Sequence, residues 1–190
     1  MSIETINPAD FVEVQDVAKL RSEQLADLEA IGLPTLGRMQ TRRATEIQSS
    51  KIGVGFETLD RFMFDPERVY PLLEELGAKW TRVQTGWSRC ETVKGQYDFE
   101  WLETIVDRLL AVGVEPFFCV SFGNQLYMPD VPHESTVGHV PLYYGDEVRQ
   151  AWHDYVVALA ECFRGKVRYW EVWNEPNIPQ FWHPSKPDGA

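Results

Sequence analysis

The feature that most constrains the fold is the alternation of short apolar runs with amphipathic stretches across residues 51–175. Apolar runs suited to strands lie at residues 52–56, 79–84, 114–122 and 167–173. Helical spacing of apolar residues predicts helices over 65–76, 98–112 and 146–163 between these strands. Three strand–helix units followed by a fourth strand predict a parallel sheet with right-handed crossovers.

Helix start and stop signals agree with this alternation. Asp65 and Pro66 provide an N-cap and a proline at the first helical position, and Gly77 follows the last apolar residue of that helix. Gly113 and Gly165 follow the next two helices in the same way. These signals therefore predict that each of the three helices ends before the next strand begins.

An open, doubly wound sheet is the alternative to a barrel. Such a sheet binds dinucleotides through a Gly-x-Gly-x-x-Gly turn after a strand. Gly53 and Gly55 lie within the first strand, and the next glycine is Gly77. The dinucleotide-binding interpretation has no support, and we expect no cofactor.

The fourth strand ends in residues that can carry chemistry. Pro176 cannot donate a hydrogen bond to a sheet, so Glu175 lies where the chain leaves the strand, with Asn174 directly before it. The carboxyl ends of strands are where α/β barrels place their active sites. The structural alternative is that Glu175 caps a loop and Asn174 makes a turn.

Two motifs resemble a known group of enzymes. The run Trp-Asn-Glu-Pro at residues 173–176 resembles the Asn-Glu-Pro signature of the clan of retaining (β/α)8-barrel glycoside hydrolases, and Gly-Gln-Tyr-Asp-Phe at residues 95–99 resembles the entry into the second helix of these enzymes. The amino-acid sequence around residues 170–182 is most similar to that of glycoside hydrolase family 39, which contains β-xylosidases and α-iduronidases. The resemblance covers about residues 51–182.

The resemblance implies roles for three polar residues. Glu175 would be the general acid/base, and Asn174 would bind the 2-hydroxyl of the sugar. Such an acid needs a raised pKa, which partial burial beside Trp173 and a nearby carboxylate would supply. Arg82, on the second strand, resembles the arginine that supports the nucleophile. Arginine inside a barrel is costly unless paired, and the alternative is that it faces the helices or solvent.

Four further residues are candidates for substrate binding. Trp87 follows the second strand and is either a sugar platform or a loop anchor. Glu57 follows the first strand and either reaches a hydroxyl or is a surface acid. Asn124 follows the third strand, in a stretch that lacks the histidine many relatives have there, and Trp182 is expected on the aglycone side.

The resemblance accounts for only half of a catalytic barrel. A complete barrel has eight strand–helix units and about 250 residues, and a retaining mechanism needs a second carboxylate. The nucleophile is expected on the seventh strand, beyond the end of this sequence. We therefore expect strands 1–4 of a TIM barrel. The chain would be a fragment of a longer enzyme, one polypeptide of a split enzyme, or a half-barrel that associates with itself. Because the nucleophile is then missing, the isolated chain can be inactive. The alternative function is a non-catalytic carbohydrate-binding or pseudo-enzyme half-barrel.

Residues 1–50 are expected to form an N-terminal extension ahead of the barrel half at 51–190. Val17, Leu20, Leu25 and Leu28 recur at roughly helical spacing, which predicts one helix over about residues 16–30. No signal or membrane-spanning pattern is present, so a cytoplasmic location is the default expectation.

Net charge and the pattern of cysteines and histidines limit the classes of ligand that the chain can bind. The net charge of −11 argues against nucleic acid or an anionic membrane as a ligand, whereas a neutral glycoside is compatible with it. The cysteines, Cys90, Cys119 and Cys162, are odd in number and match no metal-binding spacing, and the four histidines are scattered. We expect free thiols, no metal, and an oligosaccharide or glycoside as substrate.

Overall fold

A computed structural model describes residues 41–131 and 135–183. They contain one parallel sheet with the strand order β1-β2-β3-β4, in which β1 is Gly53–Gly55, β2 Trp80–Gln84, β3 Glu115–Val120 and β4 Trp170–Val172. In the register, Arg82 lies between Gly55 of β1 and Phe117 of β3. Each predicted strand is therefore present, in a shorter form.

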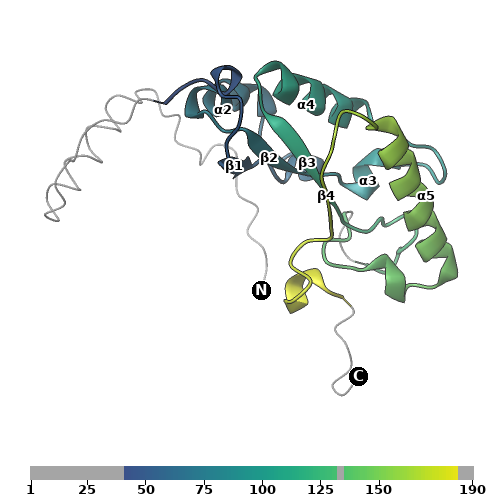
Figure 1. Ribbon diagram of the computed structural model, residues 1–190. Coiled ribbons are helices and arrows are strands. Elements are labelled where there is room, and N and C mark those ends of the chain that lie inside the picture. Colours follow the sequence, from purple (N-terminus) through teal and green to yellow (C-terminus); the bar gives the residue numbers. More distant parts are fainter. Residues whose placement is uncertain (1–40, 132–134, 184–190) are drawn as a thin grey trace, which may run out of the picture. The chain divides into compact units, whose positions relative to one another are not determined.

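Three helices alternate with the strands, as predicted. They are α2 (Tyr70–Leu76), α4 (Glu100–Ala111) and α5 (Asp146–Cys162), and all lie along the same side of the sheet (Figure 1). The main core forms between this side of the sheet and the helices; it includes Val83 and Phe118 from the strands, and Leu102 and Leu159 from the helices.

Strand order and helix placement together decide between a barrel and a doubly wound sheet. A doubly wound sheet reverses its strand order and carries helices on both faces. The observed order follows the sequence, and the described helices cover one face only. The sheet is thus the first four strands of a (β/α)8 barrel, and its other face corresponds to the barrel interior.

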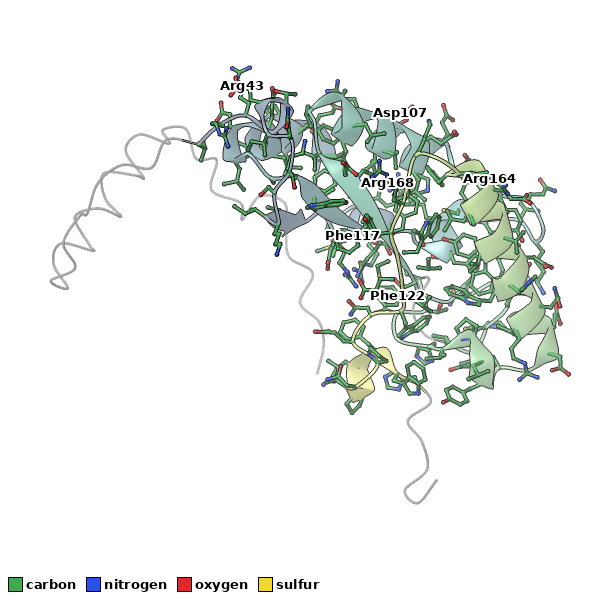
Figure 2. All side chains as sticks on the ribbon, in the orientation of Figure 1. Arg43, Asp107, Phe117, Phe122, Arg164 and Arg168 are labelled. Atoms are coloured by element: carbon green, nitrogen blue, oxygen red, sulfur yellow. The ribbon has the colours of Figure 1, made fainter. Side chains whose placement is uncertain are left out.

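The inner face of the sheet exposes large side chains. Trp80 and Phe117 are partly exposed there, and Tyr169 is 55% exposed. The ring centroids of Trp80 and Tyr169 are 5.4 Å apart. Phe117 (Figure 2) directly precedes the buried Phe118 on β3, so the two side chains point to opposite faces of the sheet. Parallel sheets are normally buried on both faces. This face therefore has the composition of a barrel interior without the cover that four further strands would give.

Residues just ahead of the predicted boundary at residue 51 pack against the barrel half. The chain divides into compact units at residues 1–40 and 41–190, and Ala44 is fully buried in the core of the second unit. Lys79 Nζ donates to the carbonyl oxygens of Ala44, at 3.1 Å, and Gly113, at 2.5 Å. Because this segment is polar, its sequence did not indicate that it packs against the core. The helix predicted over residues 16–30 lies outside the described residues.

The predicted loop after β2 contains a helix. The short α3, Trp87–Cys90, follows Gly86, whose φ of 55° lies in the left-handed region. A β-carbon at Gly86 would lie 2.3 Å from Cβ of Asp60, so this close approach requires glycine. Four residues are too few to show helical periodicity in a sequence.

Strand β4 is more exposed than a central strand. It pairs with β3 on one side, and Val172 is 75% exposed. Because β1 and β4 are the edges of the described sheet, both present unpaired backbone groups. Among the described helices, none combines the length and apolar character needed to cross a membrane.

Candidate active site

Arg82 organises the polar residues of the inner face. Its Nε and Nη2 donate to the two carboxylate oxygens of Glu171 at 2.7 and 3.0 Å, and Nη1 donates to Glu57 at 2.5 Å. Nη2 also donates to Oδ1 of Asn174 at 3.0 Å and lies 3.0 Å from the sulfur of Cys119. One guanidinium thus joins residues from all four strands or their carboxyl ends.

The network explains how an arginine is held inside the barrel. The side chain of Arg82 is 15% exposed, whereas those of Glu57 and Glu171 are 36% and 43% exposed. Burial lowers the pKa of Arg82, but the hydrogen bonds with Glu171 and Glu57 outweigh burial and raise this pKa above its ordinary value. The alternative that Arg82 faces the helices is therefore wrong, and Glu57 and Glu171 are both ion-pair partners of Arg82.

The chain turns sharply after β4. Trp173 and Glu175 both have positive φ angles, 70° and 44°, which are uncommon for residues other than glycine. The amide nitrogen of Trp173 donates to the carbonyl of Val120, and its indole packs against Phe122 and Phe181 in a second apolar cluster. Strained backbone of this kind is often found at functional sites.

Asn174 connects the turn to the arginine network. It is 8% exposed, its Oδ1 accepts from Arg82, and its Nδ2 donates to Oε2 of Glu175 at 3.3 Å. The amide orientation is therefore fixed from both ends. Asn174 and Glu175 lie together at the carboxyl edge of the sheet, as the sequence predicts.

The partial burial expected for Glu175 is not found among the described residues. Glu175 is exposed, because Trp173 turns away from it into the cluster with Phe122 and Phe181. The expectation that Trp173 would shield this carboxyl is wrong.

Trp87 is not a sugar platform. It has no exposed surface, it stacks on Tyr127 and Tyr155, and its indole nitrogen donates to the buried Glu91 at 2.5 Å. The loop-anchor alternative is the one found, because the helix α3 turns the indole into the core rather than toward the cleft.

Asn124 and Trp182 also lie apart from the Arg82 network. Asn124 is 2% exposed, and its amide joins two loops, donating to the carbonyl of Glu91 after α3 and accepting from the amide of Leu126. Trp182 lines an apolar cleft of about 330 Å³ with Trp152 and Trp173. No hydrogen bond joins either side chain to the Arg82 network within the part of the chain that the structure describes.

Sequence reasoning missed two members of the network, Glu171 and Cys119. Both lie on the inner face, where they are paired in register across β3 and β4. A signal was present for Glu171: it lies within the predicted strand at residues 167–173, and a buried arginine requires a carboxylate partner. Cys119 carried no such signal, because a cysteine within an apolar strand cannot be distinguished from an ordinary core residue.

No group of three or more His, Cys, Asp or Glu side chains in residues 41–131 and 135–183 is arranged to hold a metal ion. His139 and His183 do meet, with ring centroids 5.0 Å apart. Burial and the neighbouring His183 lower the pKa of His139.

Comparisons with known proteins find similarity to glycoside hydrolases. The Glyco_hydro_42 family model, described as beta-galactosidase, matches residues 66–123. A beta-xylosidase of Geobacillus stearothermophilus is 34% identical over 104 residues, which cover 47% of this chain and 19% of the relative. The chain therefore spans about a fifth of the length of that relative.

Solved structures share the fold. A family 39 glycoside hydrolase from the gut symbiont Bacteroides cellulosilyticus WH2 superposes with a TM-score of 0.52 at 22% identity, over 72% of this chain and 25% of that protein. A beta-galactosidase from the psychrophilic Marinomonas ef1 gives a TM-score of 0.52 at 19% identity, over 70% and 23%. The resemblance to barrel glycoside hydrolases is confirmed, and the chain has the fold of part of such a barrel.

Proposed function

We propose that this chain contributes the acid/base half of the active site of a retaining glycoside hydrolase. The observation that carries the proposal is the pair Asn174–Glu175 at the carboxyl end of β4, with Asn174 fixed by Arg82 of the inner face. The beta-xylosidase relative supports a xyloside as the first substrate to test.

Glu175 acts twice in the proposed mechanism. As a carboxylic acid it donates its proton to the glycosidic oxygen while a second carboxylate attacks the anomeric carbon and the glycosidic bond breaks. As a carboxylate it then removes a proton from the water that releases the sugar from the covalent intermediate. Since Glu175 is exposed at the carboxyl edge of the sheet, its carboxyl group is accessible to the glycosidic oxygen of a bound substrate.

Asn174 and Arg82 position the sugar and do not transfer protons. Arg82 fixes the Asn174 side chain so that its Nδ2, which contacts Glu175, can donate to a sugar hydroxyl close to the reacting carbon. Preorganised donors of this kind stabilise charge that develops in the transition state without reorganisation.

The second carboxylate is proposed to come from a strand that completes the barrel. Glu57 and Glu171 are the carboxylates of the Arg82 network, and both are ion-paired. The exposed inner face, with Trp80, Phe117 and Tyr169, supports completion by further strands of the same polypeptide, by another polypeptide, or by a second copy. The isolated chain is accordingly expected to be inactive.

The test uses the catalytically complete protein with aryl β-xylosides of graded leaving-group ability. Glu175→Ala should lower kcat/KM steeply for poor leaving groups and little for good ones, because only poor leaving groups need the proton. Glu161→Ala, which removes an exposed carboxylate from α5, is the control. Equal losses across the series would refute the assignment. A protein that binds xylosides and never cleaves them would instead support the non-catalytic carbohydrate-binding function.

A further inference from the structure

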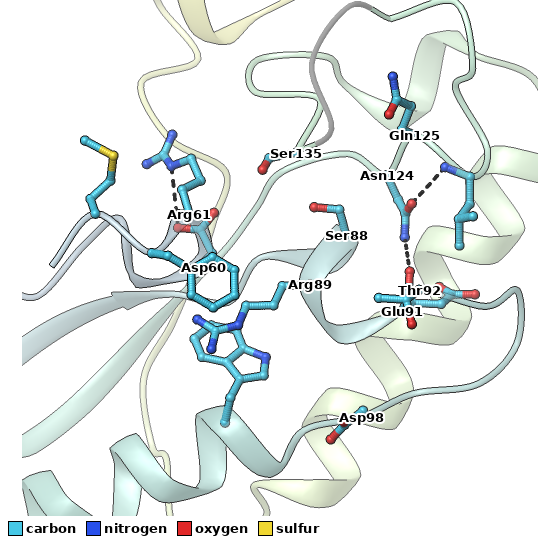
Figure 3. Close-up of a pocket in the computed structure, with 14 residues that line it drawn as sticks. Asp60, Arg61, Ser88, Arg89, Glu91, Thr92, Asp98, Asn124, Gln125 and Ser135 are labelled. Atoms are coloured by element: carbon cyan, nitrogen blue, oxygen red, sulfur yellow. Dashed lines mark hydrogen bonds and ion pairs between the residues drawn. The ribbon is translucent and has the colours of Figure 1, made fainter. Parts of the chain in front are cut away.

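A cavity of about 1050 Å³ lies beside the sheet, between the loops that follow β1, β2 and β3 (Figure 3). Its lining includes charged and aromatic side chains that the proposed acid/base chemistry does not use. Those relevant here are Asp60, Arg61, Phe62, Arg89 and Trp101.

Asp60 is a buried carboxylate to which no side chain of the described residues donates a hydrogen bond. Its side chain is 1% exposed, and neither carboxylate oxygen has a hydrogen-bond partner in the described residues. The nearest charged group is Nε of Arg61, 3.6 Å from Oδ1, and that Nε has no acceptor either. Burial raises the pKa of Asp60, against the opposing effect of Arg61. Burying a carboxylate without hydrogen bonds costs folding free energy, so the burial of Asp60 calls for a functional explanation.

Arg89 is held rigidly at the same cavity. Its guanidinium contacts the rings of both Phe62 and Trp101, 3.9 and 4.0 Å from their centroids, and Nη1 donates to the carbonyl of Leu59 at 2.5 Å. The remaining donors of Arg89 are thus presented in a fixed orientation. The indole ring of Trp101 also lines the cavity, and its nitrogen is buried beside the thiol of Cys90.

The charges around the cavity select the class of ligand. A bare anion would be repelled by Asp60 and by Asp98, which also lines the cavity. A cation would be opposed by Arg61 and Arg89. The ligand that fits must donate to a carboxylate and accept from guanidinium groups while carrying no net charge, and adjacent hydroxyl groups do both.

We propose that this cavity is a second saccharide-binding site, in which Asp60 accepts hydrogen bonds from neighbouring sugar hydroxyls and Arg61 and Arg89 donate to their oxygens. Its volume exceeds that of a single sugar ring, so it suits an oligosaccharide. The site is distinct from Asn174 and Glu175, but Arg61 connects the two through its contact with the ring of Phe122, which packs on Trp173.

The indole N–H signal of Trp101 in a ¹⁵N–¹H spectrum of the full chain reports on this cavity directly. Xylobiose and methyl β-D-xylopyranoside are the probes, a choice that rests on the proposed function, and Trp101→Phe assigns the signal. In the wild type, xylobiose should shift the Trp101 signal in a saturable manner. Asp60→Asn, which keeps the shape of the side chain, should weaken this binding about tenfold or more. Phe62→Ala, at a 75% exposed position, should also weaken binding because it frees Arg89.

Asn174→Ala separates this site from the proposed active site. It should leave the Trp101 shift intact. Loss of glycosidase activity in Glu175 variants tests the proposed function, whereas loss of xylobiose binding in Asp60 variants tests the second site, so either proposal can fail without the other. The proposal is overturned if no saccharide moves the Trp101 signal, or if Asp60→Asn and Phe62→Ala both bind xylobiose as the wild type does. Tighter binding of D-glucuronate than of methyl β-D-xylopyranoside would overturn the assignment to neutral sugars.

Discussion

Replacing Arg82 with methionine tests whether the inner-face network stabilises the sheet. Methionine keeps much of the aliphatic stem and removes the charge, so the change isolates the polar contacts. Arg82 donates hydrogen bonds to Glu57, Glu171 and Asn174, and its loss leaves two carboxylates and an amide oxygen without this donor.

The magnitude follows from the exposure of the partners. Removing one member of a fully buried ion pair costs about 3–5 kcal/mol, and an exposed pair contributes about 0–1 kcal/mol. Arg82 is mostly buried, but Glu57 and Glu171 are 36% and 43% exposed and can be rehydrated. We therefore expect Arg82→Met to lower the free energy of unfolding by about 2–3 kcal/mol.

Urea denaturation followed by far-UV circular dichroism measures this difference. Arg108→Met is the matched control, because Arg108 pairs with Glu67 at the surface of α4 and should give a much smaller change. Glu171→Gln, added to Arg82→Met, should recover part of the lost stability because one unpaired charge is removed. If Arg82→Met and Arg108→Met unfold at the same urea concentration, the network does not stabilise the sheet and the reasoning is refuted.

Three further changes are expected to have defined outcomes. Because burial raises the pKa of Asp60, the wild type should lose stability relative to Asp60→Asn as the pH rises above 3.8, and pH-dependent urea titrations that show a constant difference would contradict the burial of this charge. Trp87→Ala should cost about 3–5 kcal/mol in the same assay, since it removes a fully buried indole and the donor to Oε2 of the buried Glu91, whose Oε1 still accepts from Gly95 and Tyr127. Burial raises the pKa of Cys90 to about 12, so a thiol reagent at pH 8 should modify the partly exposed Cys162 first; mass spectrometry that finds Cys90 modified first would show that the core around it opens.

The sequence predicted the barrel because its local signals agree with the global fold. The first helical segment shows this in part: Gly77 ends α2 with a φ of 72° at the predicted position, but Asp65, which accepts from the amide of Glu67, caps a 3-10 helix at Pro66–Arg68, and α2 begins only at Tyr70. These signals are local, so one sequence is enough to reveal them. Arg82 was predictable for a related reason, because strand periodicity gives its face and the cost of burial requires partners.

The direction of loop side chains could not be predicted. Trp87 and Trp173 both follow strands at the carboxyl edge, yet α3 turns Trp87 into the core and the positive φ of Trp173 turns its indole toward Phe122. These orientations depend on contacts distant in the sequence. Asp60 was missed for the same reason: its burial depends on the close approach of Gly86 from the loop after β2.

The central claim is that Glu175 is the acid/base of a retaining glycosidase, and the reaction of Glu175→Ala with azide tests it most directly. In the catalytically complete protein, with an aryl β-xyloside that has a good leaving group, loss of the general base leaves the covalent intermediate long-lived. Azide needs no general base, so it should restore turnover and give β-xylosyl azide as the product. If azide neither restores turnover nor appears in the product, while Glu175→Ala remains folded and inactive, Glu175 is not the acid/base.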